Sequence, residues 1–293
     1  MTNILFIYGQ YNHHIWPSTA QIIRRILGHV PGAKLTGLCA QVPAQDFDVD
    51  LNGVDVVVLY YNSNPVRIEE GAGPLWPEFT RKEFEEFVSK GGGLVVIHAT
   101  NNSFAHWPAY NQMTGIGGWG GRSRDWGPYI YYNDQGELVR DPASDDWRTG
   151  SDGPPHEFLV QTRNNAHPIM AGLPEKWLHC RDEIYERLRG PATNLDVLAT
   201  AYSDGRDDAT RRHEPVAMAI GYGKGRVFHT PMGHWTYSMQ CVGFQTLLQR
   251  GTEWAATGGV TQAVPADFPT ETSVSYRKLE WDGVRIAEWT PYL

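Results

Sequence analysis

Short runs of almost uninterrupted apolar residues constrain the fold of this chain more than any other feature of its sequence. The clearest are NILFIY at residues 3–8, VDVVVLY at 54–60 and LVVI at 94–97, with a further strand expected at 33–38. A strand that is apolar on both sides needs cover on both faces, which is typical of a parallel sheet enclosed by helices. Residues 18–27 and 79–89 have apolar positions at helical spacing, so the order of elements predicts a doubly wound, mostly parallel α/β sheet.

The second half of the chain continues this pattern after an interruption. Strands are expected at 158–162, 196–199, 217–220 and 226–230, and a closing helix at 241–257. Residues 101–155 are instead rich in Gly, Trp, Tyr, Asn and Asp, with little periodicity, and we expect a long Trp-rich loop insertion that forms a lid or a pocket wall. Residues 1–257 then form one α/β domain, and residues 258–293 form a Pro-containing arm packed on it.

Charge and cysteine content exclude several classes of protein. The 293-residue chain has a formal net charge of -8 and no basic run, which argues against nucleic acid or an anionic membrane as a partner. No stretch reaches the roughly 18–20 apolar residues of a membrane span, and the N-terminal MTNILFIYGQ is typical of a strand instead of a signal peptide. Because Cys39, Cys180 and Cys241 form no CxxC pair, we expect no disulfide framework and a cytoplasmic location.

Aromatic and histidine residues are abundant and often stand in loops. The chain has 11 Trp, 14 Tyr and 11 His, many of them beside Gly, Asn or Pro. A sugar ring packs its C–H face on an aromatic plane while Asn, Asp and His meet its hydroxyls, so this content favours a small sugar ligand. An aromatic-rich core is the alternative explanation.

His98 is the strongest candidate for a functional residue. It directly follows the apolar run at 94–97, at the turn where α/β hydrolases and amidotransferases place a nucleophile. An imidazole there can act as a general acid, a general base or a metal ligand, and the alternative is a histidine that is merely hydrogen-bonded at the sheet edge. His13, His14, Tyr61 and Asn62 follow other strands and should reach the same edge.

Two further clusters carry groups of the same kind. Glu183 follows Asp182 and stands two residues before Tyr185, and a carboxylate in this position can orient an imidazole or bind a metal. The alternative is charge on a solvated turn, which is favoured more for Asp182 than for Glu183. His234 follows Gly233 in a loop after a strand and is a stronger candidate than His229, which we expect to be half-buried in that strand. His167 precedes Pro168 and is expected to fasten a loop.

Several common enzyme motifs are absent. Neither GGWGGR nor GYGKGR matches GxGxxG or GxxxxGK[ST] after the first strand, so no nucleotide cofactor is expected. There is no GxSxG, and no cysteine occupies the elbow position, which argues against serine or cysteine nucleophiles.

Taken together, FIYGQYNHH, GGGLVVIHAT, HPIMAGLP with DEIY, and YGKGRVFHTPMGH resemble the trehalose utilization, or ThuA-like, family over roughly residues 3–257. The resemblance implies a flavodoxin-like fold of the class I glutamine amidotransferase type whose nucleophilic cysteine has been replaced, with His98 at the corresponding elbow. Glutaminase activity is therefore not implied. Such families occur beside sugar oxidoreductases that make 3-keto-glycosides, so the resemblance suggests breakdown of those keto-sugars and functional coupling to a sugar dehydrogenase. It assigns His98, Glu183 and His234 as the functional trio.

The expected activity is metal-assisted cleavage of a keto-glycoside or related sugar, by elimination or by hydrolysis. A divalent metal such as zinc or manganese would be held by His98, Glu183, His234 and His14. If no metal binds, His98 and His234 would form an acid–base pair, with Tyr185 or Arg122 stabilising negative charge. Residues expected to act in catalysis are His98, Glu183, His234 and Tyr185. Residues expected to contact the sugar are Asn62, Trp119, Arg122, Trp126 and Trp235.

The rival hypothesis is a carbohydrate-binding or regulatory protein of sugar utilization that kept the fold and lost the chemistry. It differs from the enzyme hypothesis in predicting ligand binding that survives substitution of His98 and His234. The sequence leaves open the identity of the sugar, the identity of the metal and the oligomeric state, for which a homo-oligomer is one option.

Overall fold

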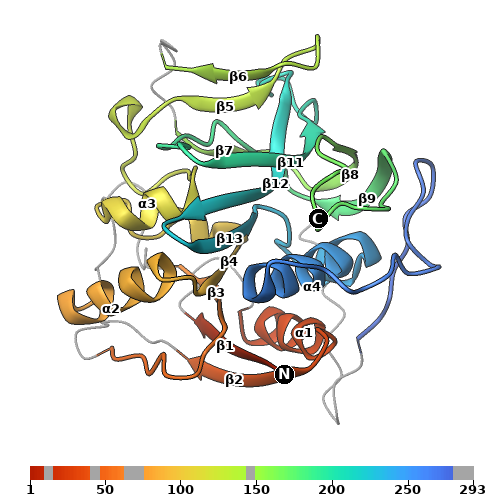
Figure 1. Ribbon diagram of the computed structural model, residues 1–293. Helices are drawn as coiled ribbons and strands as arrows, with labels where there is room; N and C mark the ends of the chain where they lie inside the picture. The colour runs from red at the N-terminus through yellow and green to blue at the C-terminus, as the bar shows by residue number, and fades with distance from the viewer. Residues whose placement is uncertain (10–15, 40–46, 63–75, 143–148, 280–293) are drawn as a thin grey trace.

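The computed structural model describes residues 1–9, 16–39, 47–62, 76–142 and 149–279. Figure 1 shows the arrangement of the elements. The helices are α1 (Trp16–Gly28), α2 (Glu78–Ser89), α3 (Pro108–Thr114) and α4 (Val242–Thr257). The strands are β1 (Thr2–Gly9), β2 (Ala33–Cys39), β3 (Val56–Tyr61), β4 (Gly93–Ile97), β5 (Tyr129–Tyr132), β6 (Leu138–Asp141), β7 (Ser151–Asp152), β8 (His156–Thr162), β9 (Lys176–Asp182), β10 (Tyr185–Glu186), β11 (Leu195–Tyr202), β12 (His213–Tyr222) and β13 (Gly225–Thr230).

Most of these strands form one mixed sheet in the order β2-β1-β3-β4-β13-β12-β11-β8-β9. The pairs from β2 to β13 are parallel, and this half is the doubly wound α/β unit that the sequence predicts. From β13 to β9 every pair is antiparallel, so the expectation of a mostly parallel sheet is correct only for the first half. Hairpin-like connections in the second half replace the helical crossovers that parallel pairing requires.

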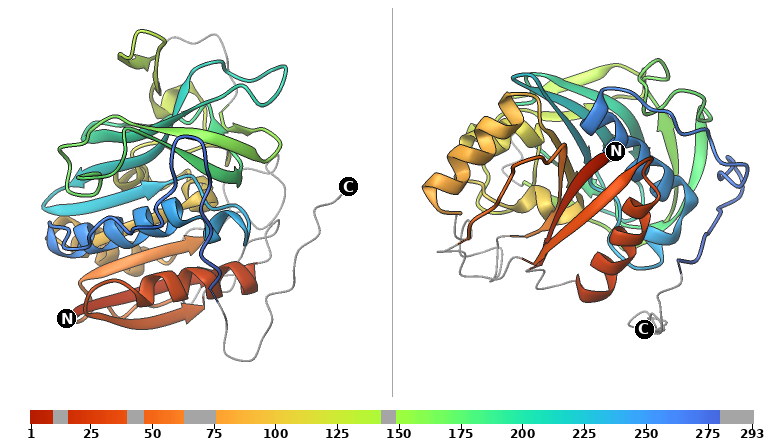
Figure 2. Two further views of the ribbon diagram at one scale, coloured as in Figure 1. Left: turned by 90° about the vertical axis from the view of Figure 1, so that its right-hand side faces the viewer. Right: turned by 60° about the horizontal axis from the view of Figure 1, so that its bottom comes forward.

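Burial explains why the apolar runs are strands of the central layer. Every residue of β3 and β4 is buried, as a sheet covered on both faces demands. Helices α1 and α4 pack together on one face and α2 covers the other, as the right-hand view of Figure 2 shows. Parallel strands β1, β3 and β4 therefore end at one common edge, where loops can bring side chains together.

The segment 101–155 is more structured than the sequence suggests. It contains α3, β5, β6 and β7, so the expectation of a long irregular loop is wrong for these parts of it. Strand β5 extends the sheet by pairing with β12 and β6, and β7 pairs with β10. Trp107 is fully buried against Trp76 and Phe104, which places it in the core, whereas Trp119 and Trp126 are half-buried and Trp147 lies outside the described residues.

The arm after α4 lies against the domain over its described part, residues 258–279, drawn in the darkest blue in Figure 1. Its carbonyl oxygens at Thr270 and Ser275 accept hydrogen bonds of 2.7 and 2.9 Å from the backbone N–H groups of Leu178 and Val242. Phe268 packs edge-on against Trp177 with ring centroids 5.4 Å apart. Tyr276 of the arm also forms an isolated bridge with Cys241.

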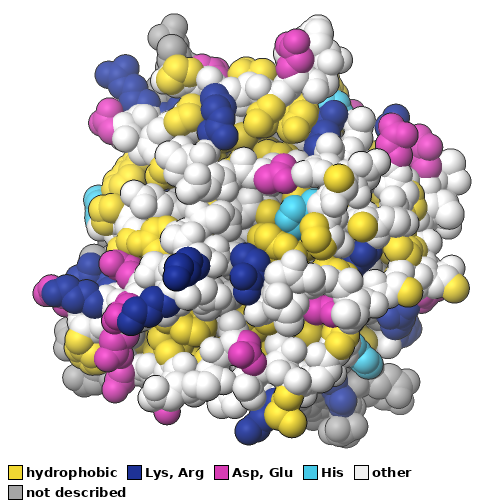
Figure 3. Space-filling model, in the orientation of Figure 1, with side chains coloured by type: hydrophobic (Ala, Val, Ile, Leu, Met, Phe, Trp, Pro, Cys, Tyr) yellow, Lys and Arg dark blue, Asp and Glu magenta, His cyan; other side chains and the backbone are white. Residues whose placement is uncertain are grey.

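The described surface agrees with the charge pattern of the sequence. On the face shown in Figure 3, basic and acidic side chains are interspersed, without a broad patch of one sign. Within the described ranges, no helix combines the length and apolar character needed to cross a bilayer.

Candidate active site

His98 occupies the turn at the end of β4. The residue has a left-handed backbone conformation with φ of 51°, and it begins a 3-10 helix, His98–Asn102. Its ring is completely buried, and Nδ1 lies 2.6 Å from the backbone oxygen of Pro231. Because a carbonyl can only accept, Nδ1 carries the proton and Nε2 keeps its lone pair. The elbow that the sequence predicts is therefore present, with an unprotonated ring nitrogen at its tip.

Two side chains that are distant in the sequence lie against His98 Nε2, and a third contacts one of them. Tyr185 Oη lies 2.9 Å from it and His234 Nδ1 lies 3.1 Å from it. His234 Nδ1 is also 2.5 Å from Glu183 Oε2. The trio that sequence analysis selected, His98, Glu183 and His234, is thus in direct contact, and Tyr185 joins it. These distances are short enough for protons to be shared along the whole chain of groups.

Asp182 holds the loops that carry this cluster. Its carboxylate accepts hydrogen bonds from the backbone N–H groups of Glu183, Gly233 and His234 at 3.0, 2.7 and 3.1 Å, and His179 Nε2 lies 3.1 Å from it. The side chain is completely buried, so the expectation that Asp182 is a charge on a solvated turn is wrong. Asp182 ties the segment before β10 to the loop after β13, and it fixes the separation of Glu183 and His234.

Burial shifts the acid–base properties of the cluster strongly. Desolvation, followed by the nearby His234, lowers the pKa of His98 to about 3, so its imidazole is neutral. Desolvation and the negative charges of Asp152 and Asp182 raise the pKa of Glu183 to about 9. Burial by itself would raise the pKa of Asp182, but the hydrogen bond and charge of His179 lower it to about 2. The cluster therefore combines neutral imidazole with a site that is rich in carboxylates and would attract a cation.

The arrangement fits a divalent metal. One ligand atom from each of His98, Glu183 and His234 lies within 4.8 Å of the others, and this donor set of imidazole and carboxylate suits zinc or manganese. The proton of His98 on Nδ1 is bonded to a backbone carbonyl, as is usual for histidines that bind metal through the other nitrogen. His14, the fourth expected ligand, and His13 lie outside the described residues.

Two of the expected aromatic walls flank the cluster. The ring of Trp235 packs against His234 with centroids 4.1 Å apart, and Trp119 packs edge-on against Tyr185 at 4.6 Å. Trp119 comes from the segment 101–155, so part of this segment lies beside the cluster, and its role as a pocket wall stays a prediction. The side chains of His234 and Glu183 keep relative exposures of 11% and 10%, so both reach the molecular surface slightly.

Asp152 is a neighbour of the cluster that the sequence analysis missed. Strand β7 pairs with β10 so that Asp152 stands directly opposite Tyr185, and side chains in such positions share one face. Desolvation raises the pKa of Asp152, while the charge of His234 acts in the opposite direction. A strand of two residues has no periodicity, so the sequence SDG at residues 151–153 predicts only a turn.

The other expected sugar-binding residues lie differently. Arg122 is buried, and its five N–H groups all donate within the chain, to Asn111 Oδ1 and to the backbone oxygens of Asn102, Ser103 and Gly118. These bonds fasten the surrounding loops and use every donor of the guanidinium group, which argues against the expected contact of Arg122 with a sugar. Trp126 contacts His106 with ring centroids 6.0 Å apart. Asn62 directly follows β3 at the same sheet edge as His98, and its contact with a sugar stays a prediction.

The remaining histidines of the sequence analysis are structural. His229 is completely buried instead of half-buried, and its two ring nitrogens lie 2.9 Å from Thr114 O and 3.1 Å from Asn101 Nδ2. His167 packs against Trp254 at 4.7 Å and accepts a hydrogen bond from the backbone N–H of Ile169, which confirms that it fastens a loop.

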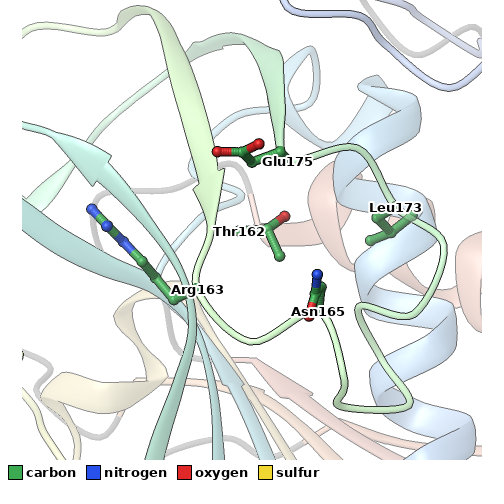
Figure 4. A pocket seen from close by; sticks show the side chains of 5 residues that line it. All are labelled: Thr162, Arg163, Asn165, Leu173 and Glu175. Carbon is green, nitrogen blue, oxygen red and sulfur yellow. The ribbon is translucent and has the colours of Figure 1, made fainter. Parts of the chain in front are cut away.

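A surface cavity of about 280 Å³ lies elsewhere in the molecule, between β8 and β9 (Figure 4). It is lined by Thr162, Arg163, Asn165, Leu173 and Glu175, none of which belongs to the cluster around His98. Arg163 is held there over the ring of Tyr132 at 4.4 Å. The cavity has no group that links it to the chemistry of the cluster.

Comparison with known proteins places these features in a family. The family model ThuA, described as trehalose utilisation, matches residues 3–255. A solved ThuA-like protein from Parabacteroides merdae is 42% identical, with 94% of this chain and 97% of that chain covered and a TM-score of 0.85. A ThuA-like protein from Bacteroides uniformis is 19% identical, with 88% and 94% covered and a TM-score of 0.56. The carbohydrate deacetylase Agd3 shares only the fold, at 12% identity, 88% and 33% coverage and a TM-score of 0.51. No curated protein matches the chain.

Proposed function

The chain belongs to the ThuA family, whose description is trehalose utilisation, and from this premise we propose that it is an enzyme that cleaves the glycosidic bond of a keto-glycoside. The observation that carries the proposal is the contact of His98, Tyr185, His234 and Glu183 at the end of β4. Buried ionisable groups in mutual contact, with perturbed pKa values, are typical of catalytic sites. The indole rings of Trp119 and Trp235 beside them offer flat apolar surfaces on which a sugar ring can pack.

We propose that His98 Nε2, His234 Nδ1 and a carboxylate oxygen of Glu183 hold a divalent metal. Loss of the Glu183 proton would accompany binding, because the cation offsets the negative charge that raises its pKa. When bound, the metal would supply an electrophile for the oxygen of a ketone or enolate. Asp182 would keep the ligands at their separation through its bonds to Gly233 and His234.

The proton transfers of such a cleavage are assigned to Asp152 and Tyr185. A ketone at C3 acidifies the proton on C2, so Asp152 takes that proton and its electron pair forms the enolate. The enolate then re-forms the ketone as a C1=C2 double bond develops, the C1–O bond breaks, and Tyr185 Oη gives its proton to the departing oxygen. Addition of water to the double bond would turn this elimination into a net hydrolysis. The raised pKa of Asp152 suits a base that works near neutral pH.

Turnover of a 3-keto-glycoside by the purified protein tests the activity. We expect the wild-type protein to release the aglycone. When His98 and His234 are both replaced by Ala, this release and the metal content of the protein should fall together. A protein that binds the sugar equally well with and without these histidines, and releases nothing, would instead be the carbohydrate-binding protein of the rival hypothesis.

Asp152→Asn tests the assignment of the base. We expect kcat to fall by about 10²-fold or more, since a positioned general base contributes that much, while the metal content stays unchanged. Asp134→Asn is the matched control, because Asp134 is an exposed carboxylate in a turn between β5 and β6. Equal loss in both variants would contradict the assignment.

The proposed substrate also implies which reaction must supply it. A 3-keto-glycoside arises by oxidation of a sugar hydroxyl, so a sugar dehydrogenase must act before this enzyme, and we propose functional coupling to one. We keep the cytoplasmic location as part of this proposal. Glutaminase chemistry is not proposed, because the elbow residue is histidine and has no thiol.

A further inference from the structure

We propose that the protein has a second metal site, for a soft divalent cation such as Zn²⁺, formed by His179, Cys180 and Cys241. One ligand atom of each lies within 4.8 Å of the others, and all three side chains are completely buried. Cysteine sulfur and imidazole nitrogen are the donors that Zn²⁺ prefers. These residues take no part in the chemistry proposed for His98, so the site is additional to the active site.

The ring of His179 is oriented for metal binding. Its Nε2 lies 3.1 Å from Asp182 Oδ2, which makes Nε2 the protonated nitrogen, because an ionised carboxylate only accepts. Its Nδ1 makes no hydrogen bond to a nitrogen or oxygen atom of the described residues, although the ring is completely buried, and the sulfur of Cys241 lies beside it. Sulfur is a weak hydrogen-bond partner, so this buried nitrogen is poorly satisfied. A cation bound to Nδ1 would satisfy it, and the carboxylate–histidine contact is the usual support of a metal-bound imidazole.

A bulge in β9 explains how His179 and Cys180 come to the same site. Neighbouring residues of a regular strand point to opposite faces. Here Phe158 pairs with His179 but His156 pairs with Asp182, so β9 has one extra residue between these pairs. A bulge of this kind redirects a side chain, which lets two adjacent residues be buried together. Cys180 Sγ lies 3.6 Å from the backbone oxygen of Ser238, on the turn that leads to Cys241.

The third ligand comes from the start of α4, and the arm closes the site. Cys241 immediately precedes α4 and forms an isolated bridge with Tyr276 of the arm. The arm also bonds to residues on either side of the ligands, namely Leu178 before His179 and Val242 after Cys241. A cation at this point would therefore join the sheet, the helix and the arm, as structural zinc sites do in small domains.

Asp182 connects the two sites. The same carboxylate that supports His179 accepts the backbone N–H groups of Gly233 and His234 in the active-site loop. A metal on the far nitrogen of His179 would fix the ring and, through it, the position of Asp182. The second site would thus position the active-site loop without contact with the substrate.

Cobalt substitution tests the proposal without any measurement of activity. The purified full-length protein would be freed of metal under reducing conditions and titrated with Co²⁺ alone. Thiolate bound to Co²⁺ gives a charge-transfer absorption band that imidazole and carboxylate ligands do not give. We expect this band to appear, with release of protons from the cluster, because the ligand atoms must be deprotonated.

Variants then assign the band to its ligands. We expect Cys180→Ser and Cys241→Ser each to abolish it, while Cys39→Ser, a matched control in β2, leaves it unchanged. The band should also survive the His98→Ala, His234→Ala variant, so the two sites are distinguished even if the proposed activity fails. Absence of the band in the folded, reduced wild-type protein would overturn the proposal, whatever the variants do. So would a band that persists in both cysteine variants.

Discussion

His98 is held in a conformation that most residues avoid. Its φ of 51° costs a non-glycine residue of order 1–2 kcal/mol, and strain of this kind is often retained where it positions a reacting group. The hydrogen bond from Nδ1 to Pro231 and the contacts of Nε2 hold the ring in place. The sequence shows this position only as a turn after the apolar run GLVVI, which predicts the residue and not its partners.

We predict that His98→Asn removes activity while it preserves the fold. Asparagine tolerates a positive φ better than alanine does, so the variant separates the loss of imidazole from backbone strain. Turnover of the keto-glycoside should fall by about 10²-fold or more, with the urea unfolding midpoint close to that of the wild type. His98→Ala should lose the same activity and be less stable. Wild-type turnover in the asparagine variant would contradict the proposed role of the His98 imidazole in the activity.

His229 makes the stability depend on pH. Desolvation lowers the pKa of His229 to about 4, although the hydrogen bond to the backbone oxygen of Thr114 by itself would raise it. Because the folded state binds a proton less readily than the unfolded state, His229 contributes stability above the unfolded pKa of 6.5. That contribution is lost as the pH falls through about 4, and it amounts to at most about 3 kcal/mol.

The measurement is urea unfolding at several pH values for the wild type, His229→Gln and His29→Gln. We expect a smaller fall in stability toward low pH in His229→Gln, because glutamine does not titrate. His29 is exposed at the end of α1, so its variant should follow the wild-type curve. Parallel curves for wild type and His229→Gln would contradict the prediction.

At the scale of elements, strands that are buried on both faces could be predicted and short paired segments could not. The runs that became β1, β3 and β4 carry their own signal, since only a covered sheet accommodates continuous apolar residues. Strands β7 and β10 have two residues each, so pairing alone defines them. This is why His98 and His234 were found from the sequence, whereas Asp152 was not.

The wall formed by Trp119 depends on the close approach of Gly150. A Cβ at Gly150 would lie 2.5 Å from the indole and 2.8 Å from the backbone nitrogen of Trp119. We predict that Gly150→Ala destabilises the protein by about 1–3 kcal/mol beyond its backbone strain and displaces Trp119 from Tyr185. Substrate KM should rise, as a steady-state assay would show.

Gly136→Ala is the matched control for this prediction. Gly136 has nearly the same φ, 77° against 80° at Gly150, but a Cβ there meets no atom within 4 Å. Its substitution should cost only the strain of the backbone, about 1 kcal/mol, and should leave KM unchanged. Equal effects of both substitutions would show that the Trp119 contact is unimportant.

At the scale of the whole molecule, the antiparallel half of the sheet and the arm were the parts least accessible to sequence reasoning. Strand β8 pairs with β9 and with the more distant β11, and alternating or continuous apolar runs do not reveal which strand is a neighbour or in which direction it runs. The contact of β9 with α4 brings His179 and Cys180 to Cys241, although these residues are far apart in the sequence. A cluster whose residues meet only in the folded chain has no motif in the sequence. The elbow at His98 differs, because it directly follows one recognisable strand.

The position of the arm leads to a prediction about the buried thiols. Phe268 packs on Trp177, and backbone bonds from the arm flank both Cys180 and Cys241. A chain that ends at Gly259 should therefore be less stable by about 2 kcal/mol or more, the value of one buried aromatic side chain. Its two thiols should also react with a disulfide reagent much faster than those of the complete chain, in a Cys39→Ser background and without metal. A chain that ends at Leu279 keeps every described contact of the arm and should react slowly. If both truncated chains react at the same rate, the arm does not protect the cluster, and the closing role assigned to it is wrong.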